Sequence, residues 1–123
     1  MIDLALQARP GGTVISPNEV VWPDGVKLVV APDTQPNATK GAKATSSCAS
    51  GNYCAHAGAN GSGSRYEYSA CPATYSVTTF QVSSVTNSRA AKNITVKRST
   101  TTVASVKPGT TTNITRAYVS LTC

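Results

Sequence analysis

Short runs of strand-forming residues, separated by turn residues, recur over most of this sequence. Val, Thr, Tyr and Ser dominate the runs, and the Leu, Glu and Lys spacing of an amphipathic helix is missing from them. Within 93–97, Ile94 and Val96 alternate with Thr95 and Lys97, which predicts a strand with one buried face. The pattern predicts strands at residues 52–56, 65–69, 78–85, 93–97, 101–106 and 114–121.

The first thirty residues follow a different pattern. Residues 2–9 carry apolar groups that suit a short amphipathic helix, and the Pro-Gly-Gly sequence at 10–12 ends it, because both residue types break helices. Further on, Asp24 and Gly25 lie between two valine-rich arms, residues 20–22 and 26–30. This dipeptide tolerates the positive φ of a tight turn, so the arms predict a hairpin.

A change in composition divides the chain. Residues 32–47 have no periodicity and few apolar side chains, which predicts a linker or a long exposed loop. We therefore expect an N-terminal extension, residues 1–45, made of the short helix, the hairpin and the linker, followed by a strand-rich domain, residues 46–123. Regularly spaced short strands with turn residues between them are typical of an antiparallel Greek-key sandwich, so the predicted fold class is all-β.

Composition and charge narrow the class of protein. A length of 123 residues suits one domain. The net charge is +6, but the 11 Lys and Arg residues are dispersed and no nucleic-acid-binding motif accompanies them, so we expect no nucleic-acid partner. No stretch is apolar enough to predict a transmembrane helix. Residues 1–10 lack the features of a signal peptide, so we expect that an exported form has lost its signal.

Three of the four cysteines and the only histidine lie within residues 48–71. The spacing is unsuitable for a zinc site built from Cys48, Cys54, His56 and Cys71, and such a site would leave Cys123 without a disulfide partner. No metal or other cofactor is therefore predicted. Cys54 and His56 face the same side of a strand, but no orienting partner or oxyanion-hole signature accompanies them, so we predict no catalytic residue and no enzyme. Four cysteines in a small, Ser- and Thr-rich chain instead predict two disulfides and a secreted protein.

The sequence alone leaves three pairings of the cysteines open. The first joins Cys48 to Cys54 and Cys71 to Cys123. The second joins Cys54 to Cys71 and Cys48 to Cys123, and the third joins Cys48 to Cys71 and Cys54 to Cys123.

Several motifs carry a family resemblance. They are "CASGNYCAHAGANGSGSRYEYSAC" at 48–71, "FQVSSVTN" at 80–87 and "VASVKPG" at 103–109. In this order they resemble the secreted actinobacterial metalloproteinase-inhibitor family with a βγ-crystallin-like fold. Upstream, "RPGGTVISPNEVVWPDGVKLVV" at 9–30 is similar to the extension that precedes the domain in longer members. The resemblance implies a βγ-crystallin-like sandwich, and it favours Cys48–Cys54 as a short disulfide.

Two departures from the family pattern limit what the resemblance implies. Calcium-binding βγ-crystallin domains carry two Asn or Asp residues where this chain has Thr79 and Phe80, so no calcium site is expected. The chain also has no cysteine between Cys71 and Cys123. The second short cysteine loop of the characterised inhibitors is therefore absent, and an inhibitory mode based on it does not carry over.

The resemblance implies a secreted, non-enzymatic binding protein that acts as an extracellular proteinase inhibitor. For the contact we select the segment 56–65, "HAGANGSGSR", and expect an exposed loop held in an extended shape. Its glycines also suit an ordinary hairpin connection, and a flexible loop loses much entropy when it binds. The candidate partner-binding residues are His56, Asn60, Ser64, Arg65 and Tyr66.

The alternative is a toxin-like or cell-wall-associated protein of the same fold without inhibitory activity. A net charge of +6 favours approach to an anionic cell-envelope component. Tyr66, Tyr68, Tyr75 and Tyr118 are the side chains that this alternative places in a sugar-stacking or membrane-facing patch.

Overall fold

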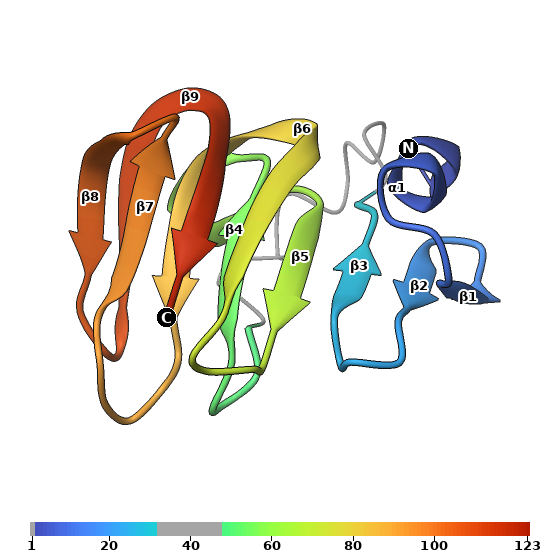
Figure 1. The fold of residues 1–123 in the computed structure, drawn as a ribbon, viewed down its shortest axis with the longest axis horizontal. Helices are drawn as coiled ribbons and strands as arrows, with labels where there is room; N and C mark the ends of the chain where they lie inside the picture. The colour runs from blue at the N-terminus through green and yellow to red at the C-terminus, as the bar shows by residue number, and fades with distance from the viewer. Residues whose placement is uncertain (1, 32–47) are drawn as a thin grey trace, which may run out of the picture.

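The computed structural model describes residues 2–31 and 48–123, which form one nine-stranded antiparallel sheet and one short α-helix (Figure 1). The predicted all-β class is confirmed. The predicted linker and the domain boundary at residue 45 lie outside the described residues. The elements are α1 (Ile2–Ala8), β1 (Thr13–Ser16), β2 (Glu19–Val21), β3 (Lys27–Val29), β4 (Tyr53–His56), the 3₁₀ turn η1 (Ala59–Gly61), β5 (Arg65–Tyr68), β6 (Thr74–Asn87), β7 (Ile94–Arg98), β8 (Thr101–Val106) and β9 (Thr110–Thr122).

The predicted N-terminal helix and hairpin are both present. β2 pairs with β3, and the turn between them is closed by the amide of Gly25, which donates to the Trp22 carbonyl at 3.0 Å. Gly25 has φ +90°, the conformation for which glycine is suited. The hairpin prediction did not include β1, which adds a further strand at the edge of the sheet. Its four residues are largely exposed, so they lack the alternating burial that marks a strand.

The strands follow the order β1-β2-β3-β5-β4-β6-β9-β7-β8. β3 pairs with β5, with Leu28 opposite Tyr66, so one hydrogen-bonded sheet runs through both described parts of the chain. The helix lies against this N-terminal part through buried Ala5, and the Trp22 indole donates to the Arg9 carbonyl at 2.7 Å. The N-terminal strands therefore belong to the same sheet as the disulfide-bonded strands.

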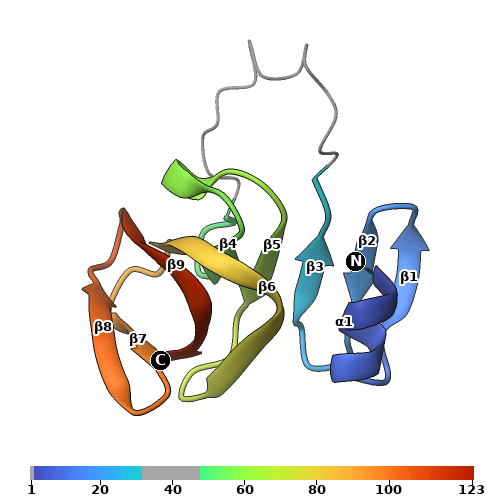
Figure 2. The same ribbon diagram turned by 90° about the horizontal axis from the view of Figure 1, so that it is seen from above.

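β6 and β9 are the longest strands, and they pair with each other along most of their length. Their register shifts between Val77 and Val82 and again before Ser84, which lets both strands bend. Figure 2 shows β8, β7, β9 and β6 curving round at one end of the sheet, with α1 beside β1–β3 at the other. Buried side chains from the curved strands form a continuous core with the aromatic residues of β4 and β5.

Both predicted disulfides form, and the structure selects the first of the three pairings. Cys48 is bonded to Cys54 across a sequence separation of 6, and Cys71 is bonded to Cys123 across a separation of 52. The longer link joins the segment before β6 to the end of β9. In the part of the chain that the structure describes, no helix is long and apolar enough to cross a membrane.

The two disulfides are expected to contribute unequally to stability. A cross-link restricts the unfolded chain more when it closes a longer loop, so replacing Cys71 and Cys123 by serine is expected to lower the free energy of unfolding by about 4 kcal/mol. Replacing Cys48 and Cys54 is expected to cost about 2 kcal/mol. Denaturant unfolding of the two double variants measures both losses. Equal losses, or a larger loss for the short link, would contradict this expectation.

Candidate functional site: a loop held by β6 and β9

The segment 57–64 connects β4 to β5 and forms a compact turn. Its base is closed by two backbone hydrogen bonds, from Ala57 to Ser64 at 2.8 Å and from Gly58 to Ser62 at 2.9 Å. Within the turn, Asn60 has φ +57° and ψ +34°. The expectation of an extended loop is therefore wrong, because the chain reverses direction within a few residues.

Close packing explains one of the glycines. A Cβ atom on Gly58 would lie 2.4 Å from the Ser62 hydroxyl oxygen and 3.0 Å from the Ser62 carbonyl oxygen. A side chain at this position would force the turn open. The Gly-rich sequence thus reflects tight packing of the loop against itself.

Two side chains from distant strands hold the loop from below. Asn113 on β9 accepts a hydrogen bond from the Asn60 amide at 2.8 Å, and its own amide group donates to the Asn60 side-chain oxygen at 2.9 Å. Ser84 on β6 accepts from the Gly61 amide at 2.9 Å and donates to the Gly58 carbonyl at 2.7 Å. Ser84 and Asn113 are direct partners in the β6–β9 register. The pairing of these two strands therefore places both contacts under the loop.

The five predicted contact residues fall into different environments. His56 is fully buried, and Ser64 and Tyr66 are each 5% exposed. Arg65 is half-buried, and only Asn60 is exposed at the loop surface. Ala59 and Gly63 are also exposed, so the surface that a partner meets at this loop consists mainly of backbone, the Ala59 methyl group and the Asn60 amide.

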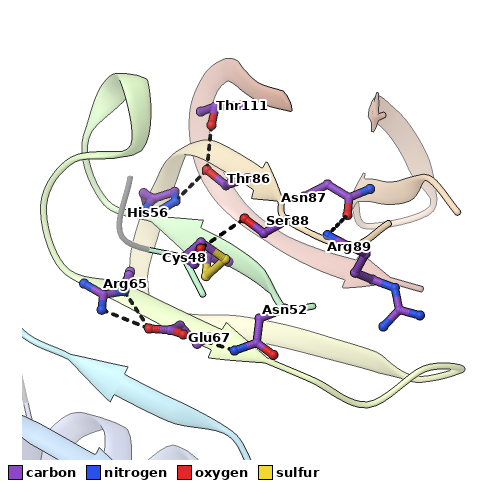
Figure 3. The surroundings of a disulfide bond; sticks show 11 residues. Cys48, Asn52, His56, Arg65, Glu67, Thr86, Asn87, Ser88, Arg89 and Thr111 are labelled. Carbon is purple, nitrogen blue, oxygen red and sulfur yellow. Dashed lines mark hydrogen bonds and ion pairs between the residues drawn. A yellow bond between two sulfur atoms is a disulfide. The ribbon is translucent and has the colours of Figure 1, made fainter. Parts of the chain in front are cut away.

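A network of polar side chains lies beneath the loop and the short disulfide (Figure 3). The Nε2 atom of His56 lies 2.9 Å from the Thr86 hydroxyl, which lies 2.8 Å from the Thr111 hydroxyl. The Nδ1 atom of His56 is buried and finds no hydrogen-bond partner among the described residues. Burial, together with the nearby Arg65 charge, lowers the pKa of His56 to about 4, so this imidazole is neutral at pH 7.

Glu67 is the centre of a second part of the network. Its carboxylate accepts hydrogen bonds from the Arg65 Nε atom at 2.9 Å and from the Asn52 side chain at 3.2 Å (Figure 3). Burial raises the pKa of Glu67, but the hydrogen bonds from Arg65 and Asn52 outweigh burial and hold the pKa below its ordinary value. Asn52 lies inside the Cys48–Cys54 loop, so the carboxylate fixes that loop to β5.

The chemistry of the site suits binding. The loop surface offers backbone donors and acceptors and one amide side chain, none of which transfers protons at neutral pH. The one histidine is buried and neutral. Within 2–31 and 48–123, no group of three or more His, Cys, Asp and Glu side chains is arranged to hold a metal ion.

The sequence pattern does not indicate that Ser84 or Asn113 is part of the site. Asn113 is 53 positions from Asn60, and Ser84 is 23 positions from Gly61. Both lie in Ser- and Thr-rich strands where a polar residue carries no special signal.

Comparisons with known proteins identify no relative: no protein-family model, no curated protein and no solved structure matches this chain.

Replacing Ser84 with alanine is expected to destabilise the protein by about 2 kcal/mol, because it leaves the Gly61 amide and the Gly58 carbonyl without partners. Hydrogen exchange at the Gly61 amide is expected to accelerate. The neighbouring Ser83→Ala on the same strand is the control and is expected to leave both quantities unchanged. Unchanged exchange at Gly61 in Ser84→Ala would show that this side chain does not hold the loop.

The buried histidine is expected to make stability depend on pH. The unfolded chain binds a proton at His56 near the ordinary pKa of 6.5, whereas the folded protein does so only near pH 4. Stability should therefore decrease as the pH falls through this interval, by up to about 3 kcal/mol from this residue. The check is the free energy of unfolding between pH 7.5 and 5, where carboxylates titrate little, for wild type and His56→Gln. Equal slopes in the two proteins would exclude His56 as the cause.

Proposed function

We propose that this protein is a secreted, non-enzymatic binding protein that presents the 57–64 loop to an extracellular proteinase and inhibits it. The observation that carries the proposal is the pair of contacts from Ser84 and Asn113, which fix the loop while Asn60 stays exposed. A loop that is already ordered loses less conformational entropy on binding than a flexible one. The rigid turn, and not an extended segment, is the part that enters the cleft of the partner.

The proposal extends to compartment and fold. Two disulfides favour an oxidising environment outside the cell, since thiols in the cytosol are kept reduced. The curved antiparallel strands and the short Cys48–Cys54 loop are consistent with the βγ-crystallin-like sandwich that the motifs imply. In this interpretation β1–β3 are an extension of the sandwich at its β5 edge.

A cell-envelope-associated protein of the same fold, without inhibitory activity, is the second candidate. It is favoured by a different surface. Tyr118 on β9 is 54% exposed, and the strands around it carry exposed hydroxyl groups and a lysine. Together with the net charge of +6, these groups suit contact with anionic polymers.

A panel of secreted metallo- and serine proteinases tests the inhibitor proposal. Wild type is expected to inhibit at least one of them at a molar ratio near one. Asn113→Ala is expected to weaken that inhibition about tenfold, because the loop loses its contacts with β9 and must be ordered on binding. Asn93→Ala, which removes an exposed amide that contacts Ser105 elsewhere, is the matched control and is expected to inhibit like wild type.

Two results would count against this function. The first is an absence of inhibition by wild type across the whole panel. The second is equal inhibition by wild type and Asn113→Ala, which would place the contact outside the loop.

A further inference from the structure

The outer face of β6, β9 and β7 carries hydroxyl groups in rows across the strands. On β6, the exposed positions Thr74, Ser76 and Thr78 alternate with the inward-facing Tyr75 and Val77. The register continues these rows over the neighbouring strands. One row contains Thr74, Thr122 and Thr95, and the next contains Ser76, Ser120 and Lys97. The Thr74 and Thr122 hydroxyls lie 3.0 Å apart and form a hydrogen bond.

Two hollows adjoin the first half of β6. The larger, of about 430 Å³, lies between β6 and the N-terminal part, where Arg9 and Val26 contribute to its wall. The smaller, of about 220 Å³, lies towards Tyr118 and Ser99. Ser76 and Thr78 line both hollows. Together they form one polar track that runs from Arg9 across β6 to Tyr118.

The tyrosines along the track have different roles. The rings of Tyr68 and Tyr75 stack with their centroids 4.3 Å apart. The ring of Tyr66 also stacks on Tyr68, with a centroid distance of 5.9 Å. Tyr66 and Tyr68 are 5% and 2% exposed, so they belong to the core and do not form the stacking patch that the sequence suggested. Tyr118 is the member of that predicted patch whose ring is open to a ligand, with 54% exposure.

Charge distinguishes between kinds of polar ligand. No residue that lines either hollow is acidic. Lys97 lies in the same cross-strand row as Ser76 and Ser120, and the chain as a whole has a net charge of +6. Arg9 is paired with Asp24, whereas Lys97 and the exposed Arg116 of β9 form no ion pair among the described residues. The surroundings of the track therefore favour a ligand with negative charges.

We propose that the track from Arg9 to Tyr118 binds a linear acidic oligosaccharide. Hydroxyl side chains exchange hydrogen bonds with sugar hydroxyls, the exposed ring of Tyr118 stacks on the apolar face of one sugar, and Lys97 pairs with a carboxylate. The length of the track, which joins two hollows, suits a chain of sugars better than a single one. This site is separate from the 57–64 loop and does not depend on the inhibitor proposal.

Isothermal titration calorimetry with a galacturonic acid hexamer tests the site, with a neutral N-acetylglucosamine hexamer as the comparison. The acidic hexamer is expected to bind more tightly than the neutral one, and its affinity is expected to fall as salt is raised. No binding of the acidic hexamer at millimolar concentration would overturn the proposal. Equal affinity for the two hexamers would also overturn it, because the charge of Lys97 would then have no role.

Three variants locate the binding. Tyr118→Ala is expected to lower the affinity for the acidic hexamer about tenfold, because a stacking contact is lost. Thr78→Val is expected to lower it about fivefold, because one hydrogen bond is lost. Lys97→Gln is expected to lower affinity about threefold and to flatten the salt dependence. The exposed Lys107→Gln, in the turn at the opposite end of β9, is the matched control for charge and is expected to bind like wild type.

The loop variant separates this site from the proposed inhibitory one. Asn113→Ala is expected to keep full affinity for the acidic hexamer whatever its effect on proteinases. Unchanged affinity in Tyr118→Ala and Thr78→Val would place the ligand elsewhere and would overturn the proposal.

Discussion

The pairing of β6 with β9 is the constraint on which the rest of the structure depends. These two strands bend together, and their shifted register brings the inward-facing side chains of both into one core. The Cys71–Cys123 disulfide joins the chain just before β6 to the end of β9, so a covalent bond closes the end of this pair. Because a core with one phenylalanine and one tryptophan gains limited hydrophobic stabilisation, a bond that restricts the unfolded chain has particular weight here.

The same pairing supplies both surfaces to which a function is assigned. At one end of the strands, Ser84 and Asn113 are partners and hold the 57–64 loop. At the other end, Ser76 and Ser120 are partners and form part of the outer hydroxyl face. A loop made of small residues thus becomes rigid through contacts with the sheet beneath it. The strand pairing also places hydroxyl side chains from different strands next to one another, so that they form a continuous polar track.

Buried polar groups give this small protein a specific interior. Glu67 is held by Arg65 and Asn52, and His56 stays neutral beside Thr86. The Glu67 carboxylate and the Nε2 atom of His56 have partners on other segments, Asn52 and Thr86, so a change of register would leave them unpaired at considerable cost. The network therefore favours one arrangement of β4, β5 and the short disulfide loop. Its contribution is to specificity of folding as well as to stability.

The sequence by itself determined the all-β class, the N-terminal helix and hairpin, the approximate positions of the described strands other than β1, and the four bonded cysteines. Strands and turns follow from the alternation of apolar and polar side chains and from turn-forming residues. Both are local properties of the chain and can be read from short stretches of sequence. The tertiary structure alone decided that His56 and Tyr66 are buried, that Tyr118 is exposed, and that Asn113 holds Asn60. These facts depend on the register between segments that are far apart in the sequence, up to 53 positions for Asn60 and Asn113, and no local pattern encodes that register.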